Sequence, residues 1–174
     1  MAVLVGIDEA GYGPLLGPLT VSSVTFWVPD ELLKADMWEL LSRAVGKQKK
    51  KLAGRLLITD SKKVYSKSAG IGHLRKTVLS AIHTLDRCID VPRTAGHLLN
   101  AVQCPTVDKL GEYPWYKSLH DKDLEGDADS VQIASGVFYN TLAEHNIKIL
   151  DISTRCLDVG YYNKMVSVVK NKAG

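Results

Sequence analysis

The hydrophobic and polar positions along the chain predict alternating strands and helices. The first apolar run, Val3 to Ile7, has no polar residue, which is typical of a central strand buried on both faces. Leu19 to Val28 alternates β-branched with small polar residues and predicts a second strand. The connection between them is rich in Gly and Pro. We therefore expect the two strands to pair antiparallel, with the connecting loop at one edge of the sheet.

Helical periodicity begins after Pro29, where Asp30 supplies a helix start. Apolar residues then recur at three- and four-residue spacing and predict one helix that ends at Gly46. Its inward face would carry Leu33, Met37, Leu40, Leu41 and Ala44. The run Lys47 to Lys51 that follows predicts a basic connector, which is solvated in most proteins and contacts phosphates in some nucleic-acid enzymes.

Three more helices are expected before the late strand. Ser66 to Leu85 predicts a helix, Ala95 to Val102 a short one, and Asp127 to Glu144 the clearest, capped by Asp127 or Asp129. The apolar stripe of the first comprises Leu74, Val78, Leu79 and Ile82. That of the third comprises Val131, Ala134, Phe138 and Leu142.

Shorter extended segments lie between and after these helices. Leu56 to Thr59 and Arg87 to Val91 each predict a short strand. Ile147 to Ile152 alternates as a strand that carries Asp151 near its end, and Arg155 to Val159 continues extended. Tyr161 to Lys172 begins a final helix.

The segment 103–126 has no firm periodicity, and we interpret it as a loop insertion. Three aromatic residues stand together in it: Tyr113, Trp115 and Tyr116. Clustered aromatic side chains in a loop can stack on nucleic-acid bases. More often they pack a loop onto the core, and this is the interpretation we favour here.

Composition places these elements in one domain. The 174 residues are 45% hydrophobic and 24% charged, as in an ordinary globular domain. The net charge of +3 is too small to indicate a nucleic-acid partner by itself. The three cysteines form no CxxC pattern, which argues against a disulfide framework or a zinc site. With no signal peptide and no apolar run of about 20 residues, we expect a cytoplasmic protein without a membrane partner.

Candidate chemistry begins where the first strand ends. Asp8 and Glu9 are adjacent carboxylates that follow the apolar run and lead into the Gly-rich loop. Mg²⁺ and Mn²⁺ favour carboxylate oxygens and keep coordination positions for water and phosphates. The pair therefore suits a metal-dependent phosphoryl site, with a solvated turn as the alternative.

The longer string Gly6-Ile7-Asp8-Glu9-Ala10-Gly11-Tyr12-Gly13-Pro14-Leu15-Leu16-Gly17-Pro18 resembles the N-terminal signature of the type 2 ribonucleases H (ribonuclease HII). Asp60-Ser61-Lys62-Lys63-Val64 is similar to the next motif of that family and follows in the expected order. The likeness covers about the first third of the chain well. It implies a ribonuclease H-like fold, a mixed sheet flanked by helices, in a single domain spanning 1–174.

The resemblance also implies roles for individual residues. Asp8 and Glu9 would bind catalytic Mg²⁺ or Mn²⁺. Gly11, Tyr12 and Gly13 would recognise the ribose beside the scissile phosphate, and Ser61, Lys62 and Lys63 would contact the nucleic-acid backbone. Tyr12 stands where the family usually has an arginine, which removes a cation from the phosphate site.

The family uses four acids, and the later two are the least clear here. Asp151 and Asp158 are the candidates, and Asp151 has the expected setting at the end of an apolar strand. Neither the Asp-Gly dipeptide nor the lysine-aspartate helix signature of the family follows. We therefore expect that the chain lacks the C-terminal part of the domain, where those acids would lie.

Two functions follow from the resemblance, and a third class is weaker. The first is a metal-dependent endonuclease that hydrolyses the RNA strand of RNA–DNA hybrids. The second is a non-catalytic, nucleic-acid-binding ribonuclease H-like domain with an incomplete acid set. A nucleotide-binding α/β protein of unrelated function is disfavoured, because the chain has neither GxxxxGK[ST] nor GxGxxG.

Overall fold

A computed structural model provides the structure of the chain. It describes residues 1–10, 18–65, 67, 70–87, 90–105 and 110–168, apart from the side chain of Trp115. Within this part of the chain, no helix is long and apolar enough to cross a membrane.

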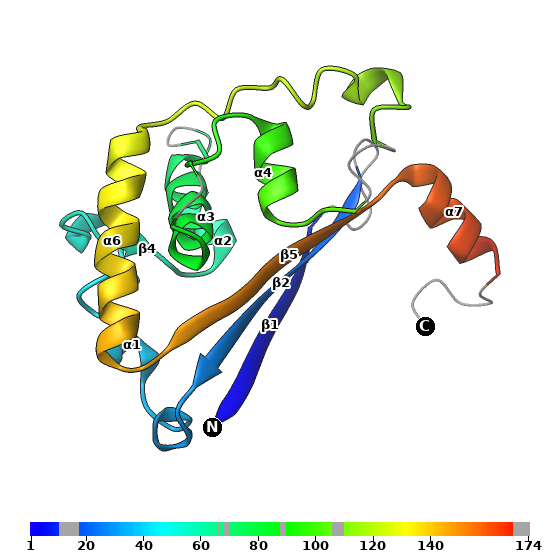
Figure 1. Cartoon of the computed structure of the whole chain (residues 1–174). Coiled ribbons are helices and arrows are strands. Elements are labelled where there is room, and N and C mark those ends of the chain that lie inside the picture. The colour runs from blue at the N-terminus through cyan, green and yellow to red at the C-terminus, as the bar shows by residue number, and fades with distance from the viewer. Residues whose placement is uncertain (11–17, 66, 68–69, 88–89, 106–109, 169–174) are drawn as a thin grey trace.

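The main sheet has three antiparallel strands in the order β1-β2-β5 (Figure 1). They are β1 (Ala2–Ala10), β2 (Leu19–Val28) and β5 (Lys148–Leu157). The predicted bounds of β2 and its antiparallel pairing with β1 are both confirmed. A separate parallel pair joins β3 (Val45–Gly46) to β4 (Leu56–Leu57). The predicted α/β class is therefore confirmed, but within the described residues the parallel pairing lies outside the main sheet.

The helices lie mostly between β4 and β5 in the sequence. Among the described residues, the α-helices are α1 (Met37–Leu40), α2 (Ser61–Val64), α3 (Gly72–Leu85), α4 (Ala95–Ala101), α6 (Ala128–Glu144) and α7 (Val159–Ser167). The same part of the chain contains the short 3₁₀ turns η1 (Asp30–Leu32), η2 (Lys49–Lys51) and η3 (Pro114–Tyr116). The predictions of α4 and α6 are confirmed, including the cap of α6 by Asp127.

One face of the sheet packs against the helices, as Figure 1 shows for α3, α4 and α6. This face carries alternate residues of β2 and β5, because side chains alternate across a strand. Val28, Phe26 and Ile149 pack with the predicted inward side of α6. Val24 and Ile152 pack with α3 and α4. The core therefore lies between the sheet and this helical layer.

The prediction that Val3 to Ile7 is a buried central strand is wrong. β1 is the edge strand of the described sheet, and its side chains are largely exposed, with 58% of Val3, 54% of Val5 and 69% of Ile7 accessible. An apolar run shows that a strand can be buried on both faces. Burial itself depends on which other elements cover those faces, and that is not encoded in the run.

The single helix predicted from Asp30 to Gly46 is also wrong. The segment forms η1, then the four-residue α1, and then the short strand β3. Asp36 explains the break, because its carboxylate accepts a hydrogen bond from the backbone N–H of Trp38 at 2.7 Å and starts a new helix there. The apolar periodicity was real, since Met37, Leu41 and Ala44 still pack in the core.

Two smaller predictions need correction. The helix expected from Ser66 begins only at Gly72, and Val78 of its predicted apolar stripe is 44% exposed. Arg87 to Val91 was expected as a strand, but its described residues, Arg87, Asp90 and Val91, belong to no strand, while 88 and 89 lie outside the described part. The short strand predicted at Leu56 is confirmed as β4.

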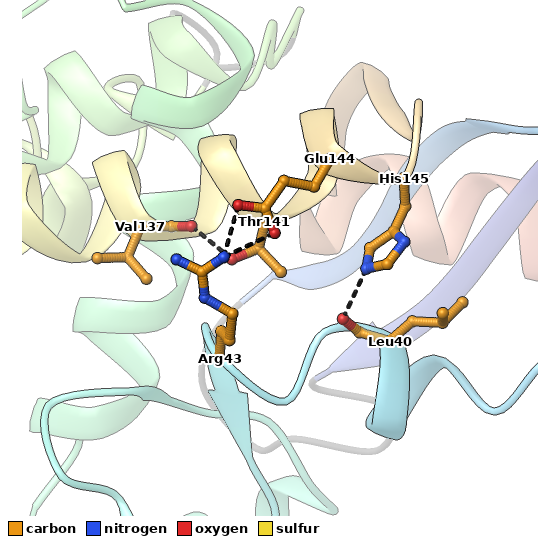
Figure 2. A network of polar contacts seen from close by, with 6 residues as sticks. All are labelled: Leu40, Arg43, Val137, Thr141, Glu144 and His145. Atoms are coloured by element: carbon orange, nitrogen blue, oxygen red, sulfur yellow. Dashed lines mark hydrogen bonds and ion pairs between the residues drawn. The ribbon is translucent and has the colours of Figure 1, made fainter.

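Polar contacts fasten the segment around α1 to the C-terminal end of α6 (Figure 2). Arg43 Nη1 donates to both carboxylate oxygens of Glu144, at 2.5 and 2.8 Å. His145 Nε2 lies 3.0 Å from the carbonyl oxygen of Leu40, which accepts the bond. Together these contacts hold the turn after α6 in place and so fix the point where β5 begins.

The described residues of the segment 103–126 have little regular structure, as predicted, and the described aromatic residues among them pack onto the protein. Tyr116 packs against a small core cluster of Cys104, Leu110 and Cys156. The Tyr113 hydroxyl contacts Asp158 just after β5. These contacts confirm the interpretation of Tyr113 and Tyr116 as residues that fasten the loop to the core.

Candidate functional site

Asp8 and Glu9 lie in the last three residues of β1, at the end of the edge strand. Asp8 is opposite Ser22 and Glu9 is opposite Val21 on β2. Both acids are exposed. The backbone N–H of Glu9 donates to Asp8 Oδ1 at 3.0 Å, which holds that carboxylate back against its own strand. The structure therefore presents two accessible carboxylates where the chain leaves the sheet.

The two carboxylates leave the strand on opposite faces. Asp8 shares its face with Ser22 and Thr154 and is on the side that the helices cover farther along the sheet. Glu9 shares the other face with Val21 and Arg155. Adjacent residues of a regular strand cannot both direct their side chains to one point. A single ion would thus be held by one of these side chains, together with other ligands.

The donor chemistry of the pair fits a hard divalent cation. Both side chains offer carboxylate oxygens, and both are accessible to water, which Mg²⁺ retains as a ligand. Across the described residues, no group of three or more His, Cys, Asp or Glu side chains is placed to hold a metal. Asp8 and Glu9 would therefore need water and substrate oxygens to complete the coordination.

Asp151 does not join this pair. It lies in the middle of β5 rather than near its end, because the strand continues to Leu157. Asp151 is opposite Thr25 of β2. The β5 residue in line with Asp8, through Ser22 of β2, lies three residues later in the chain. Two strand spacings and three residues separate the Cα atoms of Asp8 and Asp151 by about 14 Å. The predicted third acid is thus too far from Asp8 to share one ion with it.

Asp158 lies at the same end of the sheet as Asp8 and Glu9, but its carboxylate already has partners. Oδ1 accepts a hydrogen bond from the Tyr113 hydroxyl at 2.6 Å and another from the backbone N–H of Tyr161 at 2.8 Å. The second bond caps α7. The Tyr113 hydrogen bond, followed by the Tyr161 backbone bond, lowers the pKa of Asp158. The carboxylate is ionised at neutral pH and serves a structural role in this arrangement.

Ser61, Lys62 and Lys63 are the first three residues of the four-residue α2, which packs beside α3. Asp60 caps this helix, with its carboxylate accepting from the backbone N–H of Lys62 at 2.8 Å. Lys62 and Lys63 are exposed. Figure 1 shows α2 in the helical layer, apart from the end of β1. A ligand that met both the lysines and the acids would have to span the distance between them, as a nucleic-acid duplex can.

The remaining predicted site residues, Gly11, Tyr12 and Gly13, lie outside the described residues. The basic connector Lys47 to Lys51 is described and largely exposed. Within it, the Lys47 ammonium lies 4.6 Å from the centroid of the Trp38 ring. That contact fastens one end of the connector to α1 and leaves its other lysines toward solvent.

The hydrogen bond between Tyr113 and Asp158 was not predicted from the sequence, because it joins a loop without periodicity to a residue 45 positions later. The only available signal was the clustering of aromatic residues. Comparison of the chain with protein-family models, with curated proteins and with solved structures found no match.

Proposed function

We propose that the chain is a ribonuclease H-like protein that hydrolyses the RNA strand of RNA–DNA hybrids with the help of Mg²⁺ or Mn²⁺. One observation carries the proposal. Asp8 and Glu9 are consecutive, accessible carboxylates at the end of β1, and the Gly11-Tyr12-Gly13 segment follows them after Ala10. The likeness of this segment and of Asp60-Ser61-Lys62-Lys63 to the ribonuclease HII signatures supplies the reaction and the substrate.

The proposal assigns a separate role to each group of residues. Asp8 and Glu9 would each coordinate a divalent ion, and an ion bound there would lower the pKa of a coordinated water so that the water could attack a phosphodiester. Gly11, Tyr12 and Gly13 lie at the ribose of the scissile nucleotide. Lys62 and Lys63, exposed on α2, bind phosphates farther along the hybrid.

A second function is favoured by the placement of Asp151. Because its Cα atom lies about 14 Å from that of Asp8, the described acids do not form the four-carboxylate set that the resemblance implies. A domain with only the early pair would bind the hybrid without cleaving it. This non-catalytic function is the alternative to the endonuclease.

The experiment is a cleavage and binding assay on the purified chain with a labelled RNA–DNA hybrid. If the chain is an endonuclease, we expect cleavage of the RNA strand that requires Mg²⁺ or Mn²⁺. This cleavage should be lost in Asp8→Asn and in Glu9→Gln. Glu39→Gln is the matched control, because Glu39 is an exposed acid on α1 and its substitution makes the same change of charge.

Binding measured by fluorescence anisotropy separates the two functions. Salt-sensitive binding of the hybrid without cleavage in any divalent metal would support the non-catalytic domain. The absence of both binding and cleavage would reject both proposals. Cleavage that persisted in Asp8→Asn would show that the activity belongs to a contaminant or to another site.

A further inference from the structure

A pocket of about 540 Å³ lies between the N-terminal half of α3 and the first turn of α6. Its other walls come from the segments 91–93 and 123–127. Two backbone hydrogen bonds hold these segments together, from Leu124 N to the carbonyl of Arg93 at 2.8 Å and from Ala95 N to that of Lys122, also at 2.8 Å. The first turn of α6 lines the pocket, and Figure 1 shows this end of α6 apart from the end of β1 that carries the acids.

The floor of this pocket is apolar. Leu79, Val91 and Val131 are all less than 7% exposed and form one core cluster, with Leu124 partly buried beside them. Side chains of this kind offer no hydrogen bond to a ligand. A ligand that fills the pocket must therefore bring an apolar body to cover them.

Two adjacent cations of α3, Arg75 and Lys76, form one wall. Both are half-buried. Arg75 Nη1 donates to the carbonyl oxygen of Glu125, and Lys76 Nζ donates to Ser130 Oγ at 2.6 Å. Both acceptors are neutral, and no carboxylate of the described residues forms an ion pair with Arg75, Lys76 or the nearby Arg93. The pocket wall thus carries positive charge that these side-chain contacts do not neutralise.

Arg75 also has a polar group without a hydrogen-bond partner among the described residues. Its Nε is buried and has no hydrogen-bond partner, and no other side-chain nitrogen or oxygen of the described residues is in that situation. A buried N–H group without an acceptor is costly, and such groups are rare in folded proteins. A small shift of the Arg75 guanidinium on binding an anion would give this group an acceptor.

The rim of the pocket limits what the ligand can be. It carries four exposed carboxylates: Asp123, Glu125, Asp127 and Asp129. Asp127 is occupied as the cap of α6, where it accepts from the N–H groups of Asp129 and Ser130 at 3.0 and 3.2 Å. These two N–H groups of α6 are therefore not available to a ligand. The other acids repel a polyanion, so that a nucleic-acid strand or a triphosphate is disfavoured.

We infer that this pocket binds a small organic anion with one charged group, a carboxylate or a monophosphate, on an apolar body. Its charged group pairs with Arg75 and Lys76, and its body covers Leu79, Val91 and Val131. The inference is independent of the proposed nuclease function, because it uses none of the residues assigned to the hybrid.

The direct test is a titration followed by two-dimensional ¹⁵N–¹H NMR, which detects the Arg75 Nε–H group itself. Benzoate and phenyl phosphate are the probes. Each is expected to shift the Arg75 Nε–H signal saturably. Inorganic phosphate lacks the body and benzyl alcohol lacks the charge, so each should bind about tenfold more weakly or worse.

Substitutions of the two cations test whether they bind the charged group of the ligand. Arg75→Gln and Lys76→Gln are each expected to weaken phenyl phosphate binding by about tenfold or more. Lys34→Gln is the matched control, since Lys34 is an exposed lysine outside the pocket. Circular dichroism checks the fold. If Arg75→Gln does not fold, Lys76→Gln and the signal of the unchanged protein decide the question.

Three results would overturn the inference. One is the absence of a saturable shift at Arg75 Nε–H with either aromatic anion. Another is equal binding of inorganic phosphate or benzyl alcohol, and the third is an equal loss of affinity in Lys34→Gln. Because the titration can be repeated in Asp8→Asn, its outcome is separate from that of the nuclease assay.

Discussion

The hydroxyl of Tyr113 donates a 2.6 Å hydrogen bond to Oδ1 of Asp158, and this bond joins the segment 103–126 to the start of α7. The same contact lowers the pKa of Asp158 and, as its largest cause, raises the pKa of Tyr113. The two shifts agree in sign, because the bond favours the ionised carboxylate together with the protonated phenol.

Tyr113→Phe should therefore lower the thermal unfolding midpoint near neutral pH. A carboxyl with a depressed pKa in the folded state stabilises the fold above its unfolded pKa of about 3.9, and this stability is lost as the pH falls through the folded pKa. The difference in midpoint between the two proteins should thus be largest near pH 7 and shrink below about pH 3.9. Tyr65→Phe, at a tyrosine that is 49% exposed, is the control. A difference that stays constant down to pH 2 would contradict this account.

A pair of alanine substitutions tests the observed placement of β1. Leu56→Ala, at a residue 1% exposed in the core, should cost about 2–5 kcal/mol in the free energy of unfolding. Ile7→Ala, at a residue 69% exposed, should cost roughly 0.5 kcal/mol or less. Urea unfolding measures both. A cost for Ile7→Ala comparable with that for Leu56→Ala would mean that β1 is buried in solution.

The cap of α6 predicts a position-specific effect of two nearby acids. Asp127→Ala removes the carboxylate that accepts two backbone N–H groups and should cost about 0.5–2 kcal/mol. Asp129→Ala removes an acid of the same helix turn whose side chain makes no cap, and it should cost less. Urea unfolding of the two variants makes the comparison, and equal costs would contradict the assigned cap.

Lys62 and Lys63 provide a test of the proposed hybrid contacts. If each binds a phosphate, Lys62→Gln and Lys63→Gln should each weaken hybrid binding and reduce the slope of log affinity against log salt by about one. Lys34→Gln makes the same change of charge away from α2. Salt titrations by fluorescence anisotropy measure the slopes. Unchanged slopes in both α2 variants would remove these lysines from the proposed interface.

The sequence patterns predicted best the elements whose signal is local. The alternation of β2 gave its bounds to the residue, and the periodicity of α6 gave its buried side, because both elements face one core. The cap by Asp127 could be predicted for the same reason, since a capping carboxylate acts on its own next turn.

The predictions that failed depended on distant parts of the chain. Val3 to Ile7 resembles a buried strand, yet its exposure follows from its place at the edge of the described sheet. Asp151 was expected near the end of its strand, but β5 continues along the whole length of β2. At the candidate site, the adjacency of Asp8 and Glu9 was visible in the sequence. Their opposite orientations, and their distance from Asp151, required the register of the sheet.

The edge position of β1 also has a consequence for the exchange of its backbone amide hydrogens, which should be faster than that of β2. β1 is hydrogen-bonded on one side alone in the described sheet, so opening it requires breaking its ladder with β2 and disturbs little of the core. Its amides should exchange with deuterium before those of β2, which is paired on both sides. Because Asp8 and Glu9 belong to this first-opening strand, a ligand that bridges them to β2 would slow exchange along the whole of β1.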